Sequence, residues 1–205
     1  MDVFTHLCIS SKLKRIIEKE FHVRINTASF LLGSIKPDLS SKYLNIPHYK
    51  KDSEDFIQEE IRGILDSKIY ECNKCTSNFS ERLGIITHYL SDFFCYAHSE
   101  YFTGNMLKHY VYEMRLFINY IKNSKEIIDS CYDKNIVTNH NVSSICSYID
   151  DLHREYSFEV KEASPSTDMT FTFNACISLC FSIITECMVS EENFSNIAHI
   201  ENIYG

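Results

Sequence analysis

The stretch that decides the fold is residues 78–98, NFSERLGIITHYLSDFFCYAH. Asn78 is followed three residues later by Glu81, a capping-box pattern that predicts the start of a helix over 79–97. Most of the following residues are apolar, so we expect this helix to be buried. It nevertheless carries His88 and Asp92, which lie four residues apart and therefore share one helical face. Charged and imidazole groups inside a core need partners, and metal ions are efficient partners.

The remainder of the chain also reads as helical. It has only 5 glycines and 3 prolines, too few for a fold with many turns. We predict an all-α fold, a single compact domain over residues 1–205 with seven to nine helices and a metal cluster in a cleft between them. Residues 36–50 hold two prolines and are predicted to be a loop. Besides 79–97, the expected helices are 2–8, one beginning at Ser10 or Ser11 and running through 12–21, 27–33 after Asn26, 52–69, 104–123, 142–156, and a long one opening at Pro165.

Composition and charge limit the function classes. The 205 residues include 44% apolar and 23% charged residues, as is usual for a globular protein. The net charge of −8 disfavours broad nucleic-acid binding and adhesion to anionic membranes. It suits a protein that holds divalent cations through carboxylates.

The N-terminal residues and the cysteines indicate a cytoplasmic location. Residues 1–17 lack the apolar core of a secretory signal. The most apolar run, 173–189, is shorter than a membrane span of roughly 20 residues and contains polar residues, so we expect a buried helix. The nine cysteines are an odd number, which favours reduced thiols. Cys72 and Cys75 form one CxxC pair, whose role the sequence leaves open because a structural zinc site usually needs a second pair.

The histidines and carboxylates form a constellation suited to zinc. His88-x3-Asp92-x5-His98 is followed by His109-x3-Glu113, and four or five such residues in fixed register are improbable by accident. Imidazole nitrogens and carboxylate oxygens are common zinc ligands, and a carboxylate such as Asp92 can bridge two metals. We interpret four other histidines as ordinary polar residues. The complete set of candidate ligands is His6, Asp38, His48, His88, Asp92, His98, His109 and Glu113.

These motifs resemble the bacterial zinc-dependent phospholipase C family, which is related to the catalytic domain of clostridial alpha-toxin. The family pattern HxxxDx5H followed by HxxxE matches H88-YLS-D92-FFCYA-H98 and H109-YVY-E113, and the resemblance spans residues 6–113. It implies an all-helical fold with three clustered zinc ions. One would be held by Asp38, His48, His88 and Asp92, the second by His98, His109 and Glu113, and the third by His6 and the bridging Asp92.

The third site is the incomplete one. Secreted family members complete it with the backbone amine and carbonyl of an N-terminal tryptophan, and this chain has no tryptophan. We therefore predict two tightly held zinc ions and a weaker third, unless the amine and carbonyl of Met1 reach the site. The resemblance also makes Asp38 the candidate base, acting directly or by orienting a water that the metals activate.

The resulting prediction is a zinc-dependent hydrolase of phosphate esters. The first choice is a phosphodiesterase of the phospholipase C type, which releases a phosphorylated headgroup from a phospholipid or a smaller phosphodiester. The alternatives are a nuclease or phosphomonoesterase on the same metal scaffold, and a non-catalytic metal-stabilised helical protein. Nucleic acid is a less expected substrate than a phospholipid or a small phosphodiester. The sequence does not indicate an oligomeric state. Ordinary packing also explains the aromatic residues that could contact the headgroup, which are Tyr43, Tyr49, Phe56 and Tyr101.

Overall fold

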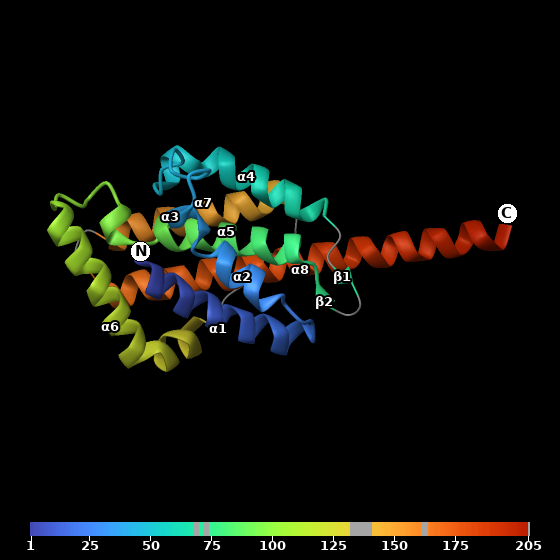
Figure 1. Cartoon of the computed structure of the whole chain (residues 1–205), viewed down its shortest axis with the longest axis horizontal. Coiled ribbons are helices and arrows are strands. Elements are labelled where there is room, and N and C mark those ends of the chain that lie inside the picture. Colours follow the sequence, from blue (N-terminus) through green and yellow to red (C-terminus); the bar gives the residue numbers. More distant parts are fainter. Residues whose placement is uncertain (68–69, 72–73, 132–140, 161–163, 205) are drawn as a thin grey trace.

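The computed structural model describes residues 1–67, 70–71, 74–131, 141–160 and 164–204, with side chains as far as Val189 except those of 70–71. In these ranges it has eight α-helices, a single 3-10 turn (η1) and two antiparallel strands of two residues each, which confirms the all-α prediction (Figure 1). The elements are α1 (Val3–Phe21), α2 (Thr27–Gly33), α3 (Lys36–Leu39), α4 (Lys50–Leu65), β1 (Tyr70–Glu71), β2 (Lys74–Cys75), α5 (Ser77–Phe93), η1 (Tyr96–His98), α6 (Met106–Cys131), α7 (Val142–Glu159) and α8 (Pro165–Tyr204).

Helix α5 lies at the centre of the bundle, with the other long helices arranged around it (Figure 1). Every residue from Leu83 to Phe93 is buried, as the sequence predicted. The predicted start at residue 79 was wrong, and the helix begins at Ser77. The Thr76 side chain caps it by accepting a hydrogen bond from the Phe79 amide at 3.2 Å. Thr76 is one of the preferred N-cap residue types and lies two residues before Asn78. The helix also ends earlier than predicted, so His98 belongs to the separate turn η1.

Two further predictions about local structure were wrong. The first two predicted helices are one, α1, capped by Asp2 rather than by either serine. The buried positions Ile9, Leu13 and Ile16 continue the helical period straight through the serines, so burial overrides the capping tendency of serine. The predicted loop 36–50 begins with the short helix α3, in which Pro37 occupies the first turn, where a proline costs no hydrogen bond.

The last helix, α8, carries the apolar run as a core element. Its residues Pro165–Val189 are long and apolar enough to cross a membrane, but most of the most apolar part is buried inside the bundle. The core helix of a globular protein passes the same length and composition test. Pro165 opens the helix, as predicted.

A close crossing of α2 and α5 positions the site. A Cβ atom on Gly84 would lie 2.3 Å from the carbonyl oxygen of Phe30, and one on Gly33 would lie 2.2 Å from that of Glu81. Real Cβ atoms do not approach a backbone oxygen so closely. Both glycines therefore allow the two backbones to touch, which brings the carbonyl group of Ser34 against the side of α5.

Candidate metal centre

The structure brings all eight predicted side chains together around His88 and Asp92 of α5. The N-terminus of the chain lies beside that end of α5 (Figure 1). They come from α1, α3, α5, η1, α6 and the loop before α4. Ligand atoms within 4.8 Å of one another form four overlapping groups, which are His6/His88/Asp92, Asp38/His48/His88, His48/Asp92/His98 and His98/His109/Glu113.

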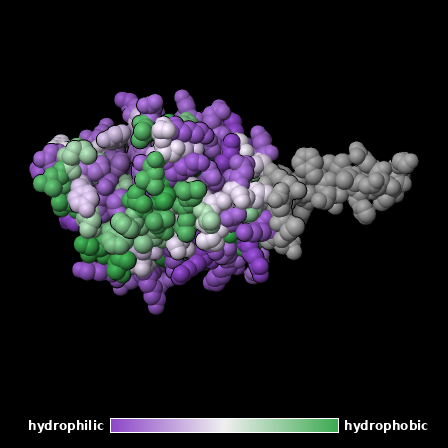
Figure 2. Space-filling view, viewed as in Figure 1, coloured by the Kyte–Doolittle hydropathy of each residue, from purple (hydrophilic) through white to green (hydrophobic). Residues whose placement is uncertain are grey.

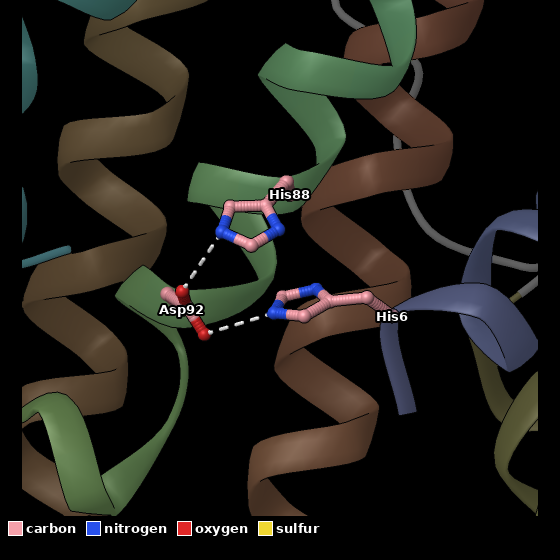
Figure 3. Close-up of side chains that lie close together, drawn as sticks. All are labelled: His6, His88 and Asp92. Atoms are coloured by element: carbon pink, nitrogen blue, oxygen red, sulfur yellow. Dashed lines mark ion pairs between the residues drawn. The ribbon is translucent and has the colours of Figure 1, made fainter. Parts of the chain in front are cut away.

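Asp92 is the centre of this cluster. Its Oδ2 lies 2.8 Å from Nδ1 of His48 and 3.4 Å from Nε2 of His88. Its Oδ1 lies 3.4 Å from Nε2 of His6 (Figure 3). The same oxygen lies 3.8 Å from Nε2 of His98. The two oxygens of one buried carboxylate thus face different sets of imidazoles, which is the arrangement that a carboxylate bridging two metals requires.

The amino group of Met1 also lies in the cluster. It forms an ion pair with Oδ1 of Asp92 and lies 3.1 Å from Nε2 of His98 and 3.4 Å from Oε1 of Glu113. Burial alone would lower the pKa of this amine, but Asp92 and Glu113 outweigh it and raise the pKa to about 11. In return, burial would raise the pKa of Asp92, but the ammonium group and the imidazoles hold it well below its ordinary value. This position therefore favours positive charge.

His88 is held in the orientation that a metal ligand needs. Its Nδ1 donates a hydrogen bond of 2.8 Å to the carbonyl oxygen of Ser34. This fixes the tautomer and leaves the lone pair of Nε2 directed at Asp92 and Asp38, at 3.4 and 3.6 Å. A ligating histidine usually donates its other nitrogen to a carbonyl or carboxylate in this way. Burial also lowers the pKa of His88 well below its ordinary value, so the ring is neutral, as a ligand must be.

A second group joins η1 to α6. Oε1 of Glu113 lies 3.3 Å from Nε2 of His98 and 2.9 Å from Nε2 of His109. Burial would raise the pKa of Glu113, but the hydrogen bond with His98 and the neighbouring positive charges lower it to about 2. Two imidazoles and an ionised carboxylate thus converge on one point, although His98 precedes α6 on a different element.

His6 tests whether these residues fit a metal. Its ring is buried and stacks on that of His88 with the ring centroids 3.9 Å apart. Within the part of the chain that the structure describes, neither of its nitrogens has a hydrogen-bond partner. An unsatisfied buried nitrogen is costly, and a metal ion between His6 and Asp92 would satisfy it. Five imidazoles and three carboxylates are also a donor set suited to zinc, so the residues fit.

Sequence reasoning missed Asp168, a fully buried carboxylate on α8. Its oxygens accept hydrogen bonds from the Tyr96 amide at 2.8 Å and from the hydroxyls of Tyr112 and Tyr156 at 2.8 and 2.9 Å. Burial raises its pKa to about 6, against the effect of these hydrogen bonds. Tyr96 opens η1 and Tyr112 precedes Glu113, so Asp168 holds the backbone of η1 and a side chain of α6 on either side of the second group. In the sequence it was only an acidic residue in the first turn of a helix, which is common.

A pocket of about 670 Å³ adjoins the cluster through His98. Two of the predicted aromatic residues, Tyr49 and Tyr101, line it together with Lys50 and Arg154. The other two do not: Tyr43 is buried, and its ring packs on that of Phe56 with the centroids 6.1 Å apart.

Two of the four histidines interpreted as ordinary polar residues have described side chains, and both lie outside the metal cluster. His22 ends α1 in the left-handed conformation, with φ 53°, and His153 packs on the ring of Phe94. His140 and the side chain of His199 fall outside the described residues. So does Cys72, which leaves the Cys72–Cys75 pair untested.

One of three comparisons with known proteins finds a match. A family model described as "Zinc dependent phospholipase C" matches residues 5–163, which include all eight candidate ligands and extend through α7, well beyond the 6–113 expected from the motifs. A search of curated proteins and one of solved structures each find no match. Because the matched range covers most of the chain, the protein belongs to the zinc-dependent phospholipase C family.

Proposed function

We propose that the protein is a phosphodiesterase of the phospholipase C type, which hydrolyses a phospholipid and releases the phosphorylated headgroup. The observation that carries this proposal is the convergence of eight zinc-type ligands beside an open pocket, in a chain that belongs to a family of zinc-dependent phospholipases C. In the reaction, the oxygen of water bonds to phosphorus, and the bond from phosphorus to the glycerol oxygen breaks. The diacylglycerol leaves with its hydroxyl protonated.

Zinc ions held here would neutralise the phosphate charge and lower the pKa of water at the site. Asp38 is the residue best placed to take the proton from that water. Its side chain is 22% exposed, against 0% for Asp92 and 11% for Glu113, so it is the most accessible carboxylate of the three. Its Oδ1 lies 3.6 Å from Nε2 of His88 and 3.7 Å from Nδ1 of His48. Burial raises the pKa of Asp38 above its ordinary value.

The pocket beside His98 is the proposed place for the headgroup. Tyr49 and Tyr101 offer aromatic surface there. The charged residues that line the pocket include both signs, and they are Lys50, Lys51, Arg154, Asp52, Glu100 and Asp150. Lys50 is held by Asp150 at 2.5 Å and by Glu54 at 3.2 Å, so its ammonium group is fixed in place.

We further propose a third zinc whose affinity depends on the Met1 amine. With His6 and Asp92 alone it would be the weakest site, and the Met1 nitrogen lies beside the same Asp92 oxygen. Once deprotonated, that nitrogen adds a third ligand. We expect three zinc ions per chain when the Met1 amine is free, and selective loss of one after mild chelation when a tag precedes Met1. Equal zinc content in tagged and untagged protein after this chelation, measured by elemental analysis, would show that the Met1 amine is not a zinc ligand.

The decisive experiment is an activity panel with a matched pair of variants. The zinc-loaded protein is assayed on a short-chain phospholipid, a phosphomonoester and single-stranded nucleic acid. We expect headgroup release from the phospholipid only. Asp38→Asn should lower turnover by orders of magnitude, while Asp55→Asn, at an exposed position on α4, should not change it.

Cleavage of the phosphomonoester or nucleic acid alone would assign the other phosphoesterase activity, and no turnover by zinc-loaded protein would indicate a structural role for the metals. Retained turnover of Asp38→Asn with full metal content would place the base elsewhere. The single domain over 1–205 and the cytoplasmic location stay predictions.

A further inference from the structure

The outward face of α6 exposes large apolar side chains along most of its length. Met106 is 81% exposed and Ile121 60%. Their spacing of three, four or one residues places them on one side of the helix. We call this set the apolar face of α6, and it consists of Met106, Leu107, Tyr110, Val111, Met114, Ile118 and Ile121.

Phe4 on α1 extends this face. Its side chain is 70% exposed, and its ring centroid lies 6.4 Å from that of Phe117 on α6. Hydrophobic side chains gather over α6 and toward the start of α1 in Figure 2. The opposite side of α6 is already used, because Tyr112, Glu113 and Leu116 point into the protein. A contiguous exposed apolar surface of this kind usually marks an interaction site.

The charges beside the apolar face indicate what it binds. Lys108, Arg115, Lys122 and Lys125 are all exposed on α6. From Met106 to Lys125 the only acidic residue is Glu113, which is buried in the metal cluster. The exposed acidic residues of α6, Glu126 and Asp129, lie beyond Lys125, in the last two turns of the helix. This part of the surface is therefore basic, although the whole chain has a net charge of −8. A helix with an exposed apolar and aromatic face flanked by lysine and arginine is typical of helices that lie in the surface of an anionic bilayer.

The same charges argue against a second copy of the chain as the occupant. Two copies that met through this face in a symmetric dimer would bring their two sets of four basic residues together. Like charges facing each other across an interface are unfavourable. An anionic lipid surface instead complements these four residues and accepts the apolar side chains between them.

The apolar face also lies close to the pocket. Tyr101 lines the pocket and precedes Met106 by only five residues. A chain of five residues spans at most about 18 Å, so the pocket edge and the first turn of α6 stay near each other. A bilayer against α6 would thus lie beside the proposed headgroup pocket.

We propose that the apolar face of α6 is the surface by which the protein docks on an anionic phospholipid bilayer. The choice of a bilayer as the source of substrate rests on the proposed function. The docking itself does not require turnover and is measured separately. The net charge of the sequence argued against such adhesion, but the fold gathers basic residues on one helix.

The test is co-sedimentation of the zinc-loaded protein with two kinds of vesicle, pure phosphatidylcholine and an equal mixture of phosphatidylcholine and phosphatidylserine. We expect binding to the mixed vesicles. Ile118→Glu and Ile121→Glu should each weaken it by roughly tenfold or more, since each removes an isoleucine that the bilayer would bury and adds a negative charge. The matched control is Val189→Glu on α8, where the side chain is 48% exposed against 46% for Ile118, and it should bind as wild type.

Charge and fold have their own controls. Lys122→Ala together with Lys125→Ala should weaken binding to the mixed vesicles only. All these positions are exposed, so far-ultraviolet circular dichroism should show unchanged helix content. The proposal is overturned if wild-type protein ignores both vesicle types, or if Ile118→Glu binds as well as wild type. It is also overturned if sedimentation velocity shows a dimer that Ile118→Glu abolishes.

Turnover of a soluble short-chain phospholipid separates this proposal from the proposed function. Ile118→Glu should keep wild-type turnover on that substrate while losing vesicle binding. Vesicle binding without hydrolysis of any phosphodiester would defeat the proposed function and leave the docking surface standing. Hydrolysis of the soluble substrate without vesicle binding would do the reverse.

Discussion

Replacing Gly84 by alanine tests the crossing of α2 and α5 that orients His88. The new Cβ would lie 2.3 Å from the Phe30 carbonyl oxygen and 2.9 Å from the Ser34 amide nitrogen. Both are backbone atoms, so α2 must move away by about 1 Å to reach an ordinary contact distance. Such overpacking costs about 1–3 kcal/mol, whereas alanine gains about 1 kcal/mol of helix propensity over glycine. We expect a net destabilisation of up to about 2 kcal/mol.

Gly63→Ala is the matched control on another helix. There the new Cβ would meet only the guanidinium end of Arg82, a flexible side chain that can move aside. Arg82 lies 3.5 Å from Glu60, in a partly exposed ion pair that contributes little stability. The helix-propensity gain then remains, and this variant should be as stable as wild type or up to about 1 kcal/mol more stable.

The two alanine variants are compared by urea unfolding of metal-free protein and by zinc content after mild chelation. Moving α2 also draws the Ser34 carbonyl away from Nδ1 of His88, so Gly84→Ala should lose zinc and Gly63→Ala should not. If Gly84→Ala matched Gly63→Ala in stability and kept all its zinc, the close crossing would not be what positions His88.

Three further predictions concern single residues. Asp92→Asn should lose more zinc than His6→Ala or His98→Ala, because both oxygens of Asp92 face imidazoles; equal losses in elemental analysis would count against a bridge. Asp168→Asn should lower the free energy of unfolding by about 1–3 kcal/mol, because the NH2 group of asparagine replaces an oxygen that accepts at least one of the three buried hydrogen bonds. Wild-type stability of this variant in urea would contradict the prediction. Burial lowers the pKa of His153 from 6.5 to about 4, so the unfolded chain binds its proton first as the pH falls. The free energy of unfolding should therefore fall by at most about 3 kcal/mol between pH 6.5 and pH 4. His153→Phe should show a smaller fall over the same pH range when both proteins are unfolded in urea.

The local part of the site could be read from the sequence. His88 with Asp92, and His109 with Glu113, are pairs within one helix, and helical geometry alone places residues four apart on one face. The helical class followed from the few glycines and prolines and from the period of the apolar residues. The errors lay at helix boundaries. Candidate caps at Ser10 and Asn78 competed with Asp2 and Thr76, and burial of the flanking residues decided between them.

Only the tertiary structure decided which distant groups meet. The Met1 amine faces Asp92 across 91 residues, and Asp168 reaches Tyr96 across 72, separations over which no sequence period operates. The glycine pair that brings Ser34 to His88 is likewise visible only where α2 crosses α5. Net charge is limited in the same way, because it is a sum over the chain and does not say where the charged residues lie on the surface. A chain with a charge of −8 still presents four basic residues beside one apolar face, since the fold turns the one acidic residue between them, Glu113, inward to the metal cluster.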